Sequence, residues 1–473
     1  MDHLETFNEL SQAIGARLFP GGEEGGFSSV VIDSRSVKEG ALFVALVGAN
    51  ADGHFYLEEA FKAGAAGAMV AKSRLDYSSL GLMRLAQKYN RKLVIVEDTL
   101  KGLQDAARTY LAKFPGLLKI GVTGSSGKTT TKEIAAAIIS QEKNVIMNSG
   151  NLNSETGLPL SVFQVRKEHE AGIFEAGMNR RGEIAELADV LNPDLALITN
   201  IGSAHIGILG SKRAIAEEKK NIFANFKGNG IALIPSDDEY REFLSEGVKG
   251  KTFFYGPDSF TELRGITSLG LEGTEINWAG ETCRFSLPGN FNLKNALAAI
   301  AIAREVHISD EGIRRGLESV KPLFGRGEII QGDTTVIRDC YNSNPESLEA
   351  AVEFCDSLDW AGRRVYVVGS MLELGEASEE AHRYIGKVLA SSLAEKVFLY
   401  GAETETAAAV LASGAFPFFH TDKMGDLERA LENYLHAGDL VLLKGSRGCA
   451  LEQLTDVLAG TSSTIPCGGV YVS

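Results

Sequence analysis

The sequence predicts an α/β protein of three domains: a small α/β N-terminal domain, a central domain with a phosphate-binding loop (P-loop) and a mostly parallel sheet, and a C-terminal Rossmann-like α/β domain. Three observations predict this architecture. The chain has 473 residues, which is too long for a single hydrophobic core. Short apolar segments alternate with helical patterns along most of it. A glycine-rich stretch, GVTGSSGKTT at 121–130, joins an apolar segment to an alanine-rich helical one.

Residues 1–98 form the predicted N-terminal domain. Apolar segments broken by glycine indicate short strands at 30–32, 42–47, 65–70 and 93–96. A helix is expected at 57–62. A longer helical stretch at 99–114 ends at Pro115 and Gly116, a stop signal that leads into the glycine-rich stretch. We place the domain boundary before this helix.

Residues 99–322 form the predicted central domain. Its strand candidates alternate with helical patterns, which is typical of a mostly parallel sheet, and they lie at 119–122, 172–175, 195–200 and 230–234. Ligands of such sheets bind at the carboxyl ends of the strands. Polar residues that follow these strands are therefore the first candidates for a site.

Residues 323–473 form the predicted C-terminal domain, which again alternates strands and helices. Strands are expected at 335–339, 364–369, 396–400 and 439–444, with a helix at 347–358 among them. This domain has no glycine-rich phosphate loop of its own. The Ser/Gly-rich tail after 460 suggests no function.

Composition excludes several functional classes. With 47 basic and 62 acidic residues the net charge is −15, which argues against nucleic acid or an anionic membrane as the main partner. The start, MDHLETFNEL, lacks an apolar signal core, and no apolar run approaches the ~18 residues of a membrane span. We therefore expect a soluble, cytoplasmic protein. Its five cysteines show no CxxC spacing and are interpreted as reduced thiols.

The glycine-rich stretch predicts a nucleoside triphosphate site. Glycines keep side chains away so that backbone N–H groups and the start of the next helix can point at phosphate oxygens. Lys128 reaches the outer phosphates, and the Thr129 hydroxyl suits Mg²⁺. Val122 stands where the longer Walker pattern has glycine, so the loop is the shorter GxxGKT type. The predicted phosphate-binding residues are Gly124, Ser125, Ser126, Gly127, Lys128, Thr129 and Thr130.

Three further polar residues lie past or near strand ends of the central domain. Glu175 ends the strand GIFE, and His205 closes the phrase NIGSAH. A carboxylate and an imidazole near a triphosphate are candidate Mg²⁺ ligands, and the alternative is that both are structural hydrogen-bonding groups. Lys219, in AEEKKNIF, has by composition the pattern of a solvated helix lysine.

Later segments offer candidates for the rest of a nucleotide. Asn292 and Asn295 lie three apart at the start of an alanine-rich helix, where two amides can pair with an adenine edge or Asn292 can cap the helix. Asp339 ends a strand and is suited either to ribose hydroxyls or to capping the helix after Pro345. The phrase LVLLKGSRG carries Lys444 and Arg447, which suit an anionic ligand or a surface turn.

Together these phrases resemble the Mur ligase family over nearly the whole chain. DSRSVKEGALFVALVGANADGHFY at 33–56 is similar to the family's uridine-nucleotide-binding domain. The central-domain phrases are GNLNSETGLP, EAGMNRRGEI and NIGSAH, and the short GxxGKT loop is the form that these ligases use. YNSNPESL at 341–348 and GSMLELGEASEEAHRYIG at 369–386 resemble the members that add D-alanyl-D-alanine rather than those that add single amino acids.

The resemblance implies a function and a role for each domain. It implies a monomeric ligase for peptidoglycan synthesis that uses ATP and Mg²⁺ to join D-alanyl-D-alanine to UDP-MurNAc-tripeptide. The N-terminal domain would bind UDP-MurNAc, the central domain ATP, and the C-terminal domain the dipeptide. A sibling that adds one amino acid and a folylpolyglutamate-synthase-like ligase are the nearest alternatives. A P-loop switch protein is the distant one, and its guanine-reading NKxD phrase is absent from the sequence.

The resemblance also assigns roles residue by residue. Glu175 and His205 match ligands of two Mg²⁺ ions, and Lys219 matches a lysine that CO₂ converts to a carbamate. Asn292 and Asn295 match adenine-site residues, Arg326 a phosphate-contacting arginine, and Asp339 a ribose-binding aspartate. Substrate contacts are expected from Ser34, Arg35, Asn151, Asn153, Asn342, Asn344, Lys444 and Ser446.

The sequence departs from the family pattern at three places. Phe291 stands where a histidine is usual, and Arg338 replaces the first of two aspartates before the YNxN phrase. Neither change removes a residue with an assigned catalytic role. The usual LNxDD phrase appears as IPSDD at 234–238, which loses the asparagine and with it the nucleotide contact expected there.

Overall fold

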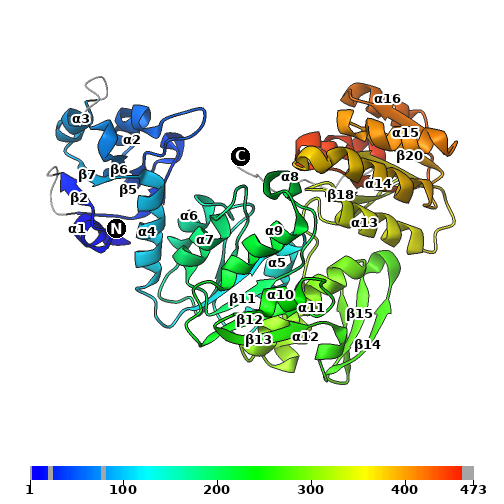
Figure 1. Ribbon diagram of the computed structural model, residues 1–473, viewed down its shortest axis with the longest axis horizontal. Coiled ribbons are helices and arrows are strands. Elements are labelled where there is room, and N and C mark those ends of the chain that lie inside the picture. The colour runs from blue at the N-terminus through cyan, green and yellow to red at the C-terminus, as the bar shows by residue number, and fades with distance from the viewer. Residues whose placement is uncertain (1–2, 20–24, 76–80, 461–473) are drawn as a thin grey trace.

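The computed structural model describes residues 3–19, 25–75 and 81–460, so Cys467 and the tail from 461 lie outside the described residues. Three domains follow one another along the chain, from the N-terminal domain in blue through the central domain in cyan and green to the C-terminal domain in yellow to red (Figure 1). The central domain contacts both of the others. In the described part of the chain, every helix is too short or too polar to cross a bilayer.

The N-terminal domain is built on a five-stranded sheet in the order β2-β7-β6-β5-β4. Only β2 is antiparallel to its neighbour. The strands are β2 (Arg17–Phe19), β4 (Ser29–Val31), β5 (Ala41–Val44), β6 (Gly67–Ala71) and β7 (Lys92–Val96). A two-stranded ladder of β1 (Glu5–Thr6) and β3 (Gly26–Phe27) lies beside it. The helices are α1 (Phe7–Ala13), α2 (Leu57–Lys62) and α3 (Leu82–Tyr89), with a 3-10 turn at Ser34–Ser36.

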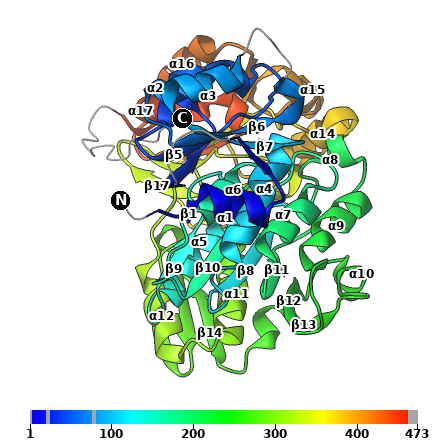
Figure 2. The same cartoon turned by 90° about the vertical axis from the view of Figure 1, so that its left-hand side faces the viewer.

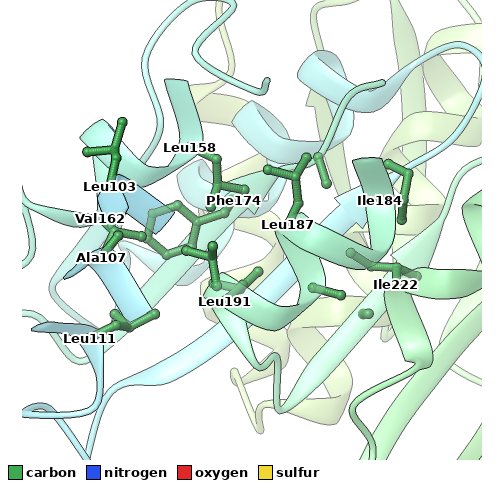
Figure 3. Close-up of a cluster of buried hydrophobic side chains, with 14 of the residues drawn as sticks. Leu103, Ala107, Leu111, Leu158, Val162, Phe174, Ile184, Leu187, Leu191 and Ile222 are labelled. Carbon is green, nitrogen blue, oxygen red and sulfur yellow. The ribbon is translucent and has the colours of Figure 1, made fainter. Parts of the chain in front are cut away.

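Helix α4 (Thr99–Leu111) connects the first two domains. It begins after Asp98, whose side chain accepts a hydrogen bond from the Lys101 N–H at 2.8 Å. One apolar stripe, including Leu103 and Ala107, faces helices of the central domain (Figure 3). The same helix contacts β6 of the N-terminal domain. Because this helix packs against both domains, it fixes the N-terminal domain against the central one.

The central domain has a six-stranded parallel sheet in the order β13-β12-β11-β8-β10-β9. The strands are β8 (Leu118–Thr123), β9 (Val145–Met147), β10 (Ala171–Glu175), β11 (Leu195–Ile198), β12 (Gly230–Pro235) and β13 (Gly250–Tyr255). The helices are α5 (Lys128–Ile139), α6 (Gly157–Val162), α7 (Glu183–Leu191), α8 (Ile206–Leu209), α9 (Lys212–Lys220), α10 (Arg241–Ser245), α11 (Asn290–Glu305) and α12 (Asp310–Ser319). The core of this sheet is continuous with the buried faces of α5 and α11.

An antiparallel sheet that the sequence did not predict extends the central domain. Its strands are β14 (Leu263–Ser268), β15 (Thr274–Trp278) and β16 (Glu281–Phe285), in that order. Along β15, Thr274, Ile276 and Trp278 are buried, and the residues between them are more exposed. This alternation is typical of a sheet with one buried and one solvent-exposed face. The buried face contacts α12, and the Trp278 indole donates to Asp310 Oδ1 at 2.9 Å.

The C-terminal domain has a six-stranded sheet in the order β17-β18-β22-β19-β20-β21, parallel except for the edge strand β17. The strands are β17 (Glu328–Gln331), β18 (Thr335–Asp339), β19 (Arg364–Gly369), β20 (Lys396–Tyr400), β21 (Phe418–Thr421) and β22 (Leu440–Lys444). The helices are α13 (Pro345–Ser357), α14 (Ser378–Ala390), α15 (Glu405–Ser413), α16 (Met424–Glu432) and α17 (Thr455–Ala459), with a 3-10 turn at Gly375–Ala377. The predicted fold class, three α/β domains, is confirmed.

Candidate active site

The P-loop follows β8 and leads directly into α5, as its sequence predicts. Gly124 and Gly127 have φ angles of +151° and +77°. A Cβ atom at Gly124 would overlap Thr199 Oγ1, and one at Gly127 would overlap Asn295 Oδ1. Only glycine fits both places. In the described structure no side chain caps the start of α5, so its first N–H groups remain available to an anion.

A largely buried chain of hydrogen bonds connects the P-loop to three other segments, which are β10, the segment at 148–153 and the start of the C-terminal domain. Thr129 Oγ1 donates to Glu175 Oε2 at 2.7 Å, and Arg326, at the start of the C-terminal domain, donates to Thr129 Oγ1 at 3.0 Å. Asn153 Nδ2 donates to the other Glu175 oxygen at 2.6 Å. Asn148 pairs with the backbone N–H and carbonyl of Glu175, at 2.8 and 3.0 Å. Thr129 and Asn153 thus hold the Glu175 carboxylate beside the P-loop, and Asn148 holds its backbone.

Lys128 lies partly buried over the loop that precedes it. Its Nζ donates to the Gly124 carbonyl at 3.0 Å. Burial lowers the pKa of Lys128, Glu175 opposes that shift, and the Arg326 guanidinium adds to it. A phosphate in the loop would supply the anionic partner that this ammonium lacks.

Lys219 differs most from its expected environment among the predicted site residues. The solvated-lysine interpretation is wrong, because its side chain lies on the buried face of α9 and the residue is 1% exposed. Within the described residues its Nζ makes no hydrogen bond or ion pair. Burial and the nearby Lys128 lower the pKa of Lys219 well below its ordinary value. The neighbouring Glu218 accepts hydrogen bonds from the Gly182 and Ile184 N–H groups, which anchors this turn of α9 to the start of α7.

His205 lies in the turn before α8 with a left-handed backbone, φ +64°. Its Nδ1 is 3.2 Å from Glu373 Oε2 of the C-terminal domain, and this imidazole lowers the pKa of Glu373. No hydrogen bond or ion pair within the described structure joins His205 to Glu175. Nor do three His, Cys, Asp or Glu side chains gather anywhere in that part as a preformed metal cluster. Oxygen ligands from bound phosphate would have to complete a Mg²⁺ site, which is the usual arrangement for this ion.

The two helix asparagines lie on α11, beside the P-loop. Asn295 is the residue that excludes a side chain at Gly127, so it borders the P-loop directly. Asn292 is buried, and its Nδ2 donates to the Pro288 carbonyl at 2.8 Å. The capping interpretation of Asn292 is wrong, since the N-cap of α11 is Gly289. Phe291, which replaces the usual histidine, packs edge-on against Phe354 of the C-terminal domain.

Asp339 and Lys444 end the neighbouring strands β18 and β22 at matching register. Lys444 is buried, and its Nζ pairs with Asp339 Oδ2 at 2.7 Å and with the Asn342 carbonyl at 3.2 Å. Lys444 therefore orients Asp339 and the turn after it. The capping alternative for Asp339 is wrong, because Asn344 caps α13. Arg447 is exposed and pairs with Glu452, as a surface turn would.

Asn344 also joins the C-terminal domain to the P-loop. Its Nδ2 donates to Ser126 Oγ at 2.9 Å, while its Oδ1 accepts the Ser347 N–H of α13. Ser446 is buried, and its hydroxyl accepts the Leu372 N–H at 2.9 Å. Asn342 is exposed in the same turn. These contacts bring the carboxyl edge of the C-terminal sheet against the mouth of the P-loop.

The residues expected to bind the nucleotide sugar lie toward the N-terminal side. Ser34 and Arg35 occupy the 3-10 turn after β4. Ser34 is buried, and the Arg35 guanidinium pairs with Asp33 at 2.7 Å while its side chain stays 83% exposed. Asn151 is exposed in the loop that carries Asn153 to Glu175. No pattern in the sequence predicted a role for Asn148, although its amide holds the backbone of Glu175 in place.

The fold and this site define a P-loop enzyme in which a second α/β domain closes over the phosphate loop. Family models agree along most of the chain: the Mur ligase family catalytic domain matches residues 27–110, the Mur ligase middle domain 122–303, and the Mur ligase glutamate ligase domain 325–447. The chain belongs to the Mur ligase family.

Individual relatives span nearly the whole chain. The UDP-N-acetylmuramoyl-tripeptide–D-alanyl-D-alanine ligase of Treponema pallidum (strain Nichols) is 43% identical over 459 residues, 96% of this chain and 99% of that protein. The crystal structure of MurF from Acinetobacter baumannii superposes with a TM-score of 0.86 at 27% identity, covering 97% and 100% of the two chains. MurF ligase from Thermotoga maritima, solved in complex with ADP, gives a TM-score of 0.76 at 28% identity over 91% and 97%.

Proposed function

We propose that this chain is an ATP-dependent amide ligase that joins D-alanyl-D-alanine to UDP-MurNAc-tripeptide and forms UDP-MurNAc-pentapeptide for peptidoglycan. The observation that carries the proposal is the hydrogen-bond chain Arg326–Thr129–Glu175, which connects the C-terminal domain to the phosphate loop. The full-length similarity to the Treponema ligase of that name supports the choice of substrates. The similarity to an ADP-bound ligase supports ATP as the nucleotide.

The first step activates the substrate carboxylate. A carboxylate is a poor acyl donor at neutral pH, so its oxygen attacks the γ-phosphorus of ATP, ADP leaves, and an acyl phosphate forms. Lys128 lies over the P-loop, where its ammonium can swing from the Gly124 carbonyl to the transferred phosphoryl oxygens. Arg326 points into the same place and adds a second positive charge. These groups stabilise charge that develops in the transition state.

The donor set at the P-loop fits Mg²⁺. Thr129 and Glu175 present hard oxygens 2.7 Å apart beside the phosphate loop. When bound, the ion would neutralise charge on the phosphates. We propose that two ions are held, the first by Thr129 and Glu175 and the second with the help of His205 and Lys219. Lys219 would serve as a carbamate, because burial disfavours the charged form of its amine and the neutral amine can add CO₂.

The second step forms the amide. The amine of D-alanyl-D-alanine attacks the acyl carbon, a tetrahedral intermediate forms, and its collapse releases inorganic phosphate and one proton. No enzyme nucleophile is required. The N-terminal domain holds the nucleotide sugar near Ser34 and Arg35, with Asn151 and Asn153 near the muramoyl group. The C-terminal domain holds the dipeptide near Asn342 and Ser446, and its closure excludes water. We further propose that the enzyme is a monomer and works in the cytoplasm, where ATP is supplied.

The choice of acceptor separates this proposal from its nearest alternatives. Purified protein with ATP, Mg²⁺ and UDP-MurNAc-tripeptide is expected to release phosphate and form an amide when D-alanyl-D-alanine is added. Single amino acids, including glutamate, are expected to give only background release. Phosphate release and mass spectrometry of the product measure both. A reaction that proceeds with one amino acid and not with the dipeptide would instead support a sibling or a folylpolyglutamate-synthase-like ligase.

A further inference from the structure

Glu346, in the first turn of α13, makes a contact between domains that none of the steps above uses. Its carboxylate accepts the Ser203 N–H at 3.1 and 3.2 Å and the Ser203 hydroxyl at 2.7 Å. The Lys212 ammonium lies 3.0 Å from the same carboxylate. Glu346 belongs to the C-terminal domain, whereas Ser203 and Lys212 belong to the central domain.

This contact is more than an exposed ion pair. Glu346 is half-buried, and hydrogen bonds from Ser203 together with the Lys212 ammonium lower its pKa although burial alone would raise it. The loop also fits closely around the carboxyl group, because a Cβ atom at Gly202 would lie 3.3 Å from Glu346 Cδ. Hydrogen bonds to an ionised acceptor are about twice as strong as neutral ones. Exposed ion pairs contribute far less.

The partners of Glu346 belong to the two segments that carry the proposed ligands of the second metal ion. Ser203 lies two residues before His205 in the loop that ends β11. Lys212 is the first residue of α9, the helix that carries Lys219. One carboxylate from the C-terminal domain therefore touches both segments at once.

The surrounding contacts bring the same surfaces together. Two residues before Glu346, the Asn344 amide donates to Ser126 of the P-loop at 2.9 Å. On the other side of His205, α8 and the 3-10 turn at Gly375–Ala377 meet backbone to backbone, since a Cβ atom at Gly207 would overlap the Gly375 N–H. Both views show α8 beside the C-terminal domain (Figures 1 and 2). Within the described residues, Glu346 pairs with both the His205 loop and α9, whereas Glu373 pairs with His205 alone.

We propose that Glu346 is a latch, a positioning residue that holds the C-terminal domain closed on the central domain and sets the His205 loop and α9 in place for catalysis. Opening the domains would remove its carboxylate from Ser203 and Lys212 and release both segments. The kinetic part of the proposal rests on the proposed function. The structural part, closure of the two domains, does not.

The test compares Glu346→Ala and the isosteric Glu346→Gln with a matched control. Glu353→Gln removes the same charge from an exposed position two turns further along α13. For Glu346→Ala we expect kcat/KM for D-alanyl-D-alanine to fall about 100-fold, with about 10-fold for Glu346→Gln. Glu353→Gln should stay within about twofold. The double variant Ser203→Ala/Glu346→Ala should have the same kcat/KM as Glu346→Ala alone, because the two substitutions remove the same interaction.

A readout that needs no substrate accompanies the kinetics. Small-angle X-ray scattering of the ligand-free variants should give a larger radius of gyration for Glu346→Ala than for the wild type and Glu353→Gln. Affinity for UDP-MurNAc-tripeptide, measured by calorimetry, should be unchanged because the latch lies away from the N-terminal domain. The latch is overturned if Glu346→Ala has the same radius of gyration as the wild type, or if its kcat/KM for D-alanyl-D-alanine stays within about threefold of the wild-type value. If the wild type itself makes no amide, the proposed function fails, and the scattering still decides whether Glu346 closes the domains.

Discussion

Replacing Lys219 with alanine is expected to remove most of the ligase activity, by a factor on the order of 100 to 1,000, and a short-chain carboxylate is expected to restore part of it. The side chain is buried with no hydrogen-bond partner in the described chain, beside Lys128 and Glu175. A carbamate there would convert a poorly solvated cation site into an anion able to orient a metal ion. Acetate or formate diffusing into the cavity left by the mutation would replace that anion. Amide formation at a series of acetate concentrations measures the rescue.

Lys227 supplies the control for this experiment. It is exposed in the same domain, so Lys227→Ala should keep wild-type activity and show no response to acetate. Full activity of Lys219→Ala without any added carboxylate would remove the carbamate from the mechanism. A loss of activity that acetate leaves unchanged would assign Lys219 a packing role instead.

Replacing Lys128 with methionine is expected to lower kcat by about 1,000-fold or more. Methionine keeps the length and apolar stem of lysine but cannot stabilise charge on the transferred phosphoryl group. Stability should hold, because burial already disfavours the charged form of Lys128, as its lowered pKa indicates. Rapid-quench measurement of ADP formation with the tripeptide substrate isolates the affected step.

The matched change Lys321→Met alters an exposed lysine at the end of the central domain and should leave the rate unchanged. A Lys128→Met enzyme that forms ADP within about tenfold of the wild-type rate would contradict the role assigned to this ammonium.

The parallel strands could be predicted from sequence because each is a short apolar run that ends in a polar turn. The segments at 335–339, 364–369 and 396–400 have the predicted limits. The antiparallel sheet β14–β16 could not be predicted in this way. One of its faces is exposed to solvent, so polar residues such as Glu275 and Arg284 interrupt the apolar pattern of its strands. The edge strand β13 has exposed Phe253 and Phe254, which also obscures its alternation.

The P-loop was predictable because its chemistry is local: glycines, a lysine and a threonine in consecutive positions. The other site residues depend on distant partners. Thr129 and Arg326 are 197 residues apart in the sequence, and Ser203 and Glu346 are 143 residues apart. No local sequence pattern can therefore predict either contact. The burial of Lys219 could not be predicted for the same reason, since AEEKKNIF alone has the composition of a solvated helix.

The pairing of Lys444 with Asp339 illustrates what strand register adds. Each residue ends a predicted strand, but their contact requires β18 and β22 to be neighbours, which the order of strands along the chain does not reveal. The assigned roles at the ribose and the dipeptide stay predictions. Their geometry nonetheless explains why a buried lysine is tolerated there, because Asp339 supplies its counter-charge.

Transfer of oxygen from the substrate carboxylate to phosphate tests the central claim most directly. UDP-MurNAc-tripeptide labelled with ¹⁸O in its terminal carboxylate is incubated with ATP, Mg²⁺ and D-alanyl-D-alanine, and both products are analysed by mass spectrometry. Activation as an acyl phosphate predicts one ¹⁸O atom in each inorganic phosphate released, together with the pentapeptide product. Unlabelled phosphate, or phosphate release without an amide product, would contradict the ligase mechanism.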